Sequence, residues 1–133
     1  MRNPIPLLPV LLAALLPACS KEPGEGGKAL IRGHVYAVDY NDNTGQPTGA
    51  AYYMPECRVY IRYGDGEFYD DDVRTGPSGE YEFRWLRPGD YTVFTYSECP
   101  LDCDSGVELV AHSVHIGGNR DAVDVPDLNI ENW

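Results

Sequence analysis

The strongest constraint on the fold is an alternation of apolar and polar residues with a period of two, which begins near Ala29. Successive side chains of a β-strand point to opposite faces, so this period predicts strands with one face toward a core. After Ala29, no stretch of ten or more residues has the apolar spacing of a helix. The alternating segments are LIRGHVYAV (30–38), CRVYIRY (57–63), EYEFRWL (80–86), DYTVFTYS (90–97), VELVAHSVHI (107–116) and AVDVPDLNI (122–130), the last bent at Pro126.

Turn-forming residues separate these segments at regular intervals. Gly64-Asp65-Gly66 predicts a hairpin between VYIRY and EFY. Short strands at this spacing predict an all-β protein with one antiparallel β-sandwich of about seven strands. The turn signals fall at residues 43–45, 64–66, 77–79, 88–90 and 117–119.

The stretch TGPSGEYEFRWLRPGDYTV (75–93) contains two alternating runs separated by Arg-Pro-Gly-Asp. Gly79 suits a position with positive φ, and Pro88-Gly89 suits a type II turn. We therefore predict a hairpin that forms one wall of the sandwich. Its core-facing residues would be Tyr81, Phe83, Leu86, Tyr91 and Val93.

Four segments resemble carboxypeptidase-regulatory-like domains, the transthyretin-like and Cna-B-like β-sandwiches: GHVYAVD, CRVYIRY, TGPSGEYEFRWLRPGDYTVF and DVPDLNI. The resemblance covers roughly residues 29–130 and implies an immunoglobulin-like or prealbumin-like fold with an accessory, non-catalytic role. The positions that carry it are Gly33, Val35, Thr75, Gly79, Tyr81, Phe83, Leu86, Pro88, Gly89, Tyr91 and Val93.

The first 18 residues have the pattern of a secretory signal peptide. A positive charge at Arg2 precedes the apolar run IPLLPVLLAALL, whose 12 residues are too few to cross a bilayer. LPAC (16–19) resembles the lipobox of bacterial lipoproteins, which implies cleavage before Cys19 and acylation of that residue. The acyl chains would make a membrane the first partner of the protein. The alternative is an ordinary signal peptide in which Cys19 is incidental.

Three parts of the chain follow from this assignment. Residues 1–18 are the lipoprotein signal peptide, 19–28 are the lipidated cysteine with a flexible tether, and 29–133 are the β-sandwich. The tether prediction rests on SKEPGEGGK, which has no large apolar residue to bury. The expected location is the cell envelope, as an outer-membrane lipoprotein that faces the periplasm or the cell surface.

Charge excludes one class of partner. Loss of Arg2 with the signal peptide leaves nine basic and 21 acidic residues, a formal charge of −12. Such a chain is repelled by polyanions, so nucleic acid is not an expected partner.

A catalytic apparatus is also not expected. The chain has three histidines, and none lies in a recognisable motif with serine or cysteine. It has no phosphate loop, nucleophile elbow or zinc-protease motif. We therefore do not expect an enzyme.

Cys57, Cys99 and Cys103 remain after lipidation, and disulfides persist outside the cytoplasm. Cys99 and Cys103 enclose a loop short enough for a local bridge, which is the favoured pairing. Cys57 would then be a buried free thiol. The alternative pairs Cys57 with Cys99, because both fall on inward positions of their strands. Three thiols with no neighbouring histidine do not suggest zinc.

Asp39, Asn41 and Asn43 place oxygen ligands at alternate positions, as calcium loops do. The glycine and the later bidentate glutamate of such loops are missing, so the segment is a weak calcium candidate. A solvated turn is the alternative. No other cofactor is expected.

Tyrosine is abundant, with ten residues. Tyr60, Tyr69 and Tyr96 are expected on an outer sheet face, where aromatic rings can stack on sugars; tyrosine is also a strong strand former. The sequence therefore favours a non-catalytic cell-envelope lipoprotein that acts as a structural or binding module. The alternative is a carbohydrate-binding module of the starch-binding-like kind. The further partner would be an envelope protein or a glycan.

Overall fold

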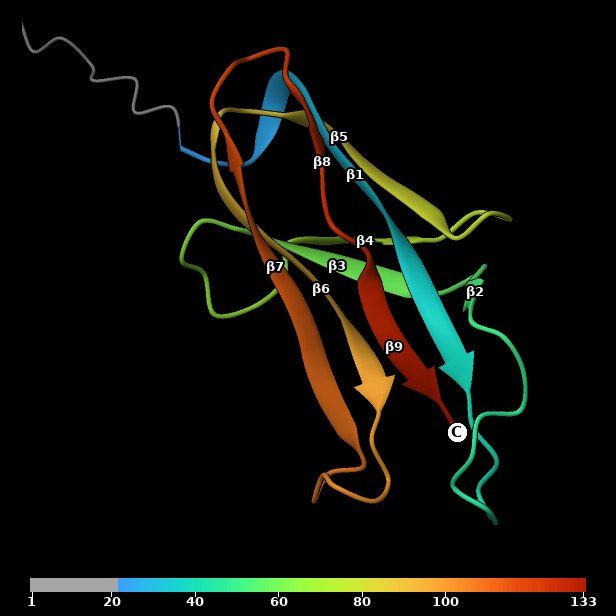
Figure 1. Ribbon diagram of the computed structural model, residues 1–133. Coiled ribbons are helices and arrows are strands. Elements are labelled where there is room, and N and C mark those ends of the chain that lie inside the picture. The colour runs from blue at the N-terminus through green and yellow to red at the C-terminus, as the bar shows by residue number, and fades with distance from the viewer. Residues whose placement is uncertain (1–21) are drawn as a thin grey trace, which may run out of the picture.

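The computed structural model describes residues 22–133, and these form a β-sandwich of two sheets (Figure 1). One sheet has five strands around β1, with β5 and β2 on one side and β8 and β9 paired to it as well. The other sheet has four strands in the order β4-β3-β6-β7. The strands are β1 (Glu25–Asp39), β2 (Tyr52–Tyr53), β3 (Arg58–Tyr63), β4 (Asp71–Arg74), β5 (Glu80–Leu86), β6 (Gly89–Glu98), β7 (Val107–Ile116), β8 (Ala122–Asp124) and β9 (Leu128–Asn132).

The all-β prediction is confirmed, with two differences in the strands. The described chain has nine strands, because the short β2 and β4 were not expected and the final segment divides at Pro126 into β8 and β9. Proline has no amide to donate to a ladder, which explains the division. The sheets are also not purely antiparallel, since β8 and β9 both run parallel to β1.

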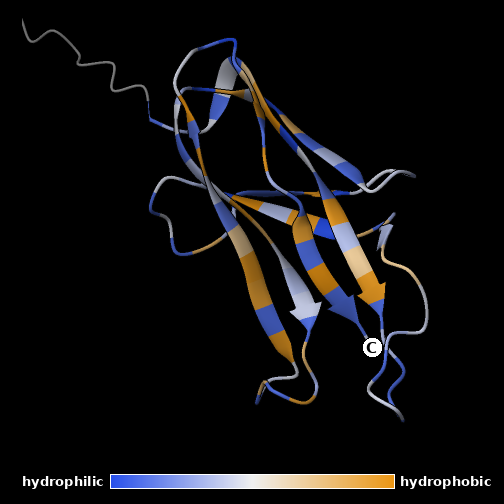
Figure 2. Cartoon of the chain, in the orientation of Figure 1, coloured by the Kyte–Doolittle hydropathy of each residue, from blue (hydrophilic) through white to orange (hydrophobic). Residues whose placement is uncertain are grey.

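The core lies between the sheets and is built by the predicted alternation. In β1, Ile31, Val35 and Ala37 are fully buried, whereas Arg32 is exposed and His34 lies on the same outer face. Figure 2 shows the same alternation of hydrophobic and hydrophilic residues along β9. The five residues expected to face the core from 75–93 are all buried: Tyr81, Phe83, Leu86, Tyr91 and Val93.

The predicted hairpin between residues 80–86 and 90–97 is wrong. Strand β5 pairs with β1, whereas β6 pairs with β3 and β7 in the other sheet. The short Arg87-Pro88 connection therefore crosses from one sheet to the other. In a hairpin and in a connection between sheets alike, the apolar side chains of both strands face one core. The alternation of apolar and polar residues therefore does not distinguish the two arrangements.

Two other boundaries differ from the sequence prediction. The tether was expected to end at residue 28, but β1 begins at Glu25, and the Gly24 amide donates to the Tyr91 hydroxyl at 2.8 Å. Tether residues 19–21 lie outside the described part of the chain. The β3–β4 hairpin exists, but its connection runs over 64–70, and EFY (67–69) is not a strand.

Within residues 22–133 there is no helix of the length and apolar character needed to cross a membrane. The predicted signal peptide and Cys19 lie outside the described residues.

Candidate functional site

Four aromatic side chains gather on the outer face of the β4-β3-β6-β7 sheet. Tyr60 comes from β3, Phe94 and Tyr96 from β6, and Tyr69 from the 64–70 connection. We call these four residues the aromatic face. It brings together all three tyrosines that the sequence indicated as candidates for stacking on sugars.

Strand register explains the cluster. Tyr60 is paired with Phe94 across β3 and β6, so two rings meet side by side on one face. Phe94 is paired in turn with Ala111 of β7, and Tyr96 with Leu109. The small side chain of Ala111 leaves the β7 side of Phe94 open.

The rings have two different orientations. Tyr60 and Phe94 are stacked, with ring centroids 5.1 Å apart and planes 14° apart. The Tyr69 and Tyr96 rings each meet Tyr60 edge-to-face, with centroids at 4.9 Å and 5.8 Å. Tyr60 and Phe94 therefore each cover one ring face of the other, and they support the two flanking tyrosines.

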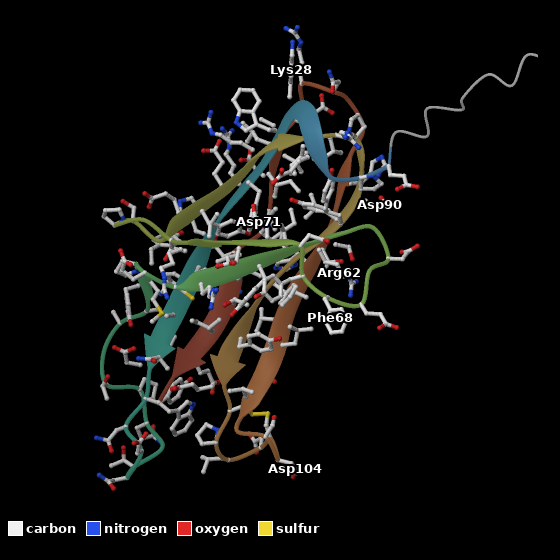
Figure 3. All side chains as sticks on the ribbon, turned by 180° about the vertical axis from the view of Figure 1, so that it is seen from behind. Lys28, Arg62, Phe68, Asp71, Asp90 and Asp104 are labelled. Carbon is white, nitrogen blue, oxygen red and sulfur yellow. A yellow bond between two sulfur atoms is a disulfide. The ribbon has the colours of Figure 1, made fainter. Side chains whose placement is uncertain are left out.

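Exposure identifies the rings that can touch a ligand. Tyr69 is 48% exposed and Tyr96 is 50% exposed, whereas Tyr60 and Phe94 are partly buried. Phe68, labelled in Figure 3, is 80% exposed in the same connection as Tyr69. Large aromatic surface left in solvent in this way is typical of a binding surface.

The polar residues around the aromatic face are mostly paired with one another. The Arg58 guanidinium lies 5.5 Å from the Tyr60 ring centroid, and its Nε donates to Asp72 at 2.7 Å. Arg62 Nη2 donates to the Thr92 hydroxyl at 3.2 Å. The Arg58–Asp72 pair balances charge locally, whereas Arg62 contacts a neutral hydroxyl. The result is an aromatic surface that can stack against a flat apolar face of a ligand.

The cysteines follow the favoured prediction. Cys99 and Cys103 form a disulfide, and Cys57 is a free, half-buried thiol. Burial raises the pKa of the Cys57 thiol, which keeps it protonated and unreactive near neutral pH. The rival Cys57–Cys99 bridge is wrong. In the described chain, the one group with metal-ligand spacing is Cys99, Cys103 and Glu108, and its two sulfurs are already bonded to each other.

Two of the residues predicted as weak calcium ligands accept hydrogen bonds from other groups of the protein. Asn41 Oδ1 accepts the backbone N–H groups of Asn43 and Thr44 at 2.9 Å and 3.1 Å, which is the geometry of an Asx turn. Asp39 Oδ1 accepts hydrogen bonds from Tyr52 and Asn132. The oxygens of Asp39 and Asn41 therefore stabilise a turn and a strand end, and calcium binding here stays a prediction without further support.

An open cleft of about 720 Å³ lies where β4 of the β4-β3-β6-β7 sheet meets β1, β5 and β8 of the other sheet. Two of its ion pairs are Arg32 with Asp124 at 2.6 Å and Arg84 with Glu82 at 3.1 Å, whereas Arg74 and Glu80 in its lining contact backbone groups. We place the candidate site on the aromatic face, where half-exposed aromatic rings lie together.

The sequence prediction missed Phe94 and Phe68. Phe94 lies two residues before Tyr96 in β6 and therefore faces the same side of the sheet, so the alternation of side chains is sufficient to predict its position. Phe68 lies in a connection without periodic signal, and no pattern in the sequence could place it.

Comparisons with known proteins show similarity to solved structures. No family model and no curated protein matches the chain. A crystal structure from Pseudomonas aeruginosa, described as that of a candidate carbohydrate-binding protein, superimposes with a TM-score of 0.50. The match covers 80% of this chain and 90% of that chain, at 15% sequence identity. At this identity the likeness concerns the fold alone.

Proposed function

We propose that this protein is a non-catalytic carbohydrate-binding module of the bacterial cell envelope, held at a membrane by a lipid on Cys19. The observation that carries the binding proposal is the aromatic face, in which Tyr69 and Tyr96 stand half-exposed against a stacked Tyr60–Phe94 pair. The shared fold with a protein described as a candidate carbohydrate-binding protein supports it.

The charge of the molecule narrows the class of glycan. The chain carries a formal net charge of −11, and its pI is about 4.4. A strongly acidic protein repels anionic polysaccharides at long range. The four residues of the aromatic face carry no charge themselves, and Arg58 beside them is paired with Asp72. We therefore expect a neutral glycan, such as a glucan or a xylan, whose apolar ring faces can lie on Tyr69 and Tyr96.

Tyr69→Ala and Tyr96→Ala should each weaken binding to neutral glycan without unfolding the protein. Both rings are about half-exposed, so their loss removes contact area for the ligand and little of the core. We expect roughly a 3- to 10-fold loss of affinity for each, the size of one aromatic contact. The measurement is retardation in native gels that contain soluble starch, mixed-linkage glucan or xylan, in which an acidic protein migrates readily.

Tyr53→Ala is the matched control. Tyr53 is 47% exposed, but it lies on β2 in the other sheet, next to His34 and Tyr36. Its removal should leave retardation unchanged. An equal loss of retardation in the Tyr53→Ala control would contradict carbohydrate binding. The absence of retardation of the wild-type protein by any neutral glycan would also contradict it. The protein would then be a structural or protein-interaction module.

Cys19→Ala should release the protein from the membrane fraction. The proposed anchor is the diacylglycerol thioether on Cys19, and each buried CH₂ of an acyl chain contributes about 0.8 kcal/mol. Fractionation of cells that express the wild type and the variant measures the effect. Ser20→Ala is the neighbouring control and should remain bound. A variant that stays in the membrane fraction would contradict lipid anchoring at Cys19.

A further inference from the structure

Trp85 is an exposed aromatic residue with an unusual backbone. Its φ is +58°, which side chains other than glycine adopt only at a cost, and its side chain is 64% exposed. It lies where the β1–β5 ladder is irregular, since Leu86 is paired with both Glu25 and Ala29. A strained backbone that holds a large aromatic ring in solvent suggests a role in binding, and the aromatic face is on the other sheet.

The chain enters the sandwich beside Trp85. The Gly24 carbonyl accepts the backbone N–H of Arg87 at 2.9 Å, only two residues from Trp85. Gly24 is itself held by the Tyr91 hydroxyl at 2.8 Å. The position at which the tether joins the folded domain is therefore fixed next to this tryptophan.

The proposed anchor lies close to this entry point. From Cys19 to Gly24 the chain advances five residues, which reach at most roughly 18 Å when fully extended. Glu25 and Ala29 lie at the same level, since both pair with Leu86, and from Ala29 strand β1 leads away for ten residues to Asp39, or roughly 33 Å at the usual rise of a strand. The end of the sandwich that carries Trp85 must therefore lie nearest to the membrane that holds the lipid.

Basic and apolar residues surround Trp85. Lys28, Leu30 and Arg84 line a shallow depression with it. Arg120 is exposed in the adjoining 117–121 connection, whose Asn119 carbonyl accepts the Lys28 amide at 3.2 Å. We call Lys28, Leu30, Arg84, Trp85 and Arg120 the docking surface. Figure 3 shows Lys28 at one end of the molecule and Asp104 at the other.

Charge is distributed unequally between these two ends. The connections of the far end, 40–51 and 99–106, contain no lysine or arginine but contain Asp42, Asp102 and Asp104. At the end that carries Trp85, Arg84 is paired with Glu82, and Glu22, Glu25 and Asp121 offset further positive charge, so this end is close to neutral. An anionic lipid surface therefore repels the far end and accepts the docking surface.

We propose that the docking surface lies on the lipid headgroups of the membrane that holds the Cys19 anchor. Tryptophan and basic side chains are the residues that proteins place at the membrane–water interface, the ring at headgroup level and the cations against lipid phosphates. Docking presents the far end and the sides of the sandwich, including the aromatic face, to the surroundings. This inference rests on the proposed lipid anchor and does not depend on carbohydrate binding.

The two tryptophans of the chain allow a direct test, because Trp85 and Trp133 are far apart: the C-terminus lies at the end of the sandwich away from the N-terminal entry (Figure 1). Trp133→Phe leaves Trp85 as the only tryptophan, and Trp85→Phe leaves Trp133. Each mature lipoprotein is reconstituted into phosphatidylglycerol–phosphatidylethanolamine vesicles that contain lipids brominated on their acyl chains. Trp85 emission should shift to the blue and be quenched several-fold more strongly than emission from Trp133, which stacks on Tyr40.

A double variant tests the contribution of the basic side chains to docking on the lipid headgroups. Lys28→Glu with Arg84→Glu, in the Trp133→Phe protein, should lower the quenching in anionic vesicles and change little in phosphatidylcholine vesicles. Equal quenching of the two tryptophans would overturn the inference, as would a Trp85 emission that responds to added neutral glycan but not to lipid. A Cys19 peptide of unmodified mass would instead overturn the anchor itself, together with this inference.

Discussion

Gly79→Ala should destabilise the sandwich by about 2–4 kcal/mol, although it adds one methyl group. Gly79 has a φ of +71°, where an L side chain is strained. A Cβ at this position would lie 2.8 Å from Tyr53 Cβ and 2.9 Å from the Met54 amide nitrogen. Both atoms belong to or adjoin backbone, so no side-chain rotation relieves the contact. The Gly79 carbonyl also accepts the Val35 amide at 2.9 Å, which ties this turn to β1.

Alanine variants of two other glycines separate the cost of a positive φ from the cost of the close contact at Gly79. Gly45 has a φ of +67°, and a Cβ at this position would meet no atom within 4 Å, so Gly45→Ala should cost only the conformational part, about 1 kcal/mol. Gly49 has open space and no positive φ, so Gly49→Ala should change stability by less than about 0.5 kcal/mol. Urea titrations of the three variants measure the differences as shifts in midpoint. Equal midpoints for Gly79→Ala and Gly45→Ala would contradict the close backbone contact.

The sequence predicted the faces of the strands better than their partners. Alternation identified Ile31, Val35, Tyr81 and Tyr91 as core residues, because burial of one strand face is a local property of the chain. Pairing is not local. β5 and β6 look like a hairpin in sequence, yet they belong to opposite sheets and share only the core between them.

For the candidate site too, the sequence indicates which face a side chain lies on but not which side chains it meets. Parity along β3 and β6 places Tyr60 and Tyr96 on an outer face, but only the register between these strands brings them together with Phe94. Tyr69 lies in a connection, and its contact with Tyr60 depends on the path of residues 64–70. In the sequence, Trp85 lies three residues before the turn signal at 88–90 and has no other distinguishing feature. Its positive φ lies beside the irregular β1–β5 pairing, which has no signature in the residue pattern.

Tyr91→Phe should destabilise the protein by about 1–3 kcal/mol, whereas Tyr81→Phe should be neutral or slightly stabilising. Both side chains are almost fully buried, at 2% and 3% exposure, and burial raises the pKa of both phenols, so each keeps its proton near neutral pH. The Tyr91 hydroxyl accepts the Gly24 amide at 2.8 Å and donates to the Arg87 carbonyl at 2.7 Å. The Tyr81 hydroxyl has no hydrogen-bond partner among the described residues.

The two variants remove the same atom from two environments, so their difference measures hydrogen bonding and not size. Without its hydroxyl, residue 91 leaves a buried Gly24 amide without a partner and releases the segment that joins the tether to the domain. Without its hydroxyl, residue 81 loses only a polar atom that burial already penalises. Thermal unfolding of both proteins at neutral pH decides between these outcomes. Equal destabilisation by the two variants would mean that the Tyr91 hydroxyl does not hold the N-terminal segment in place.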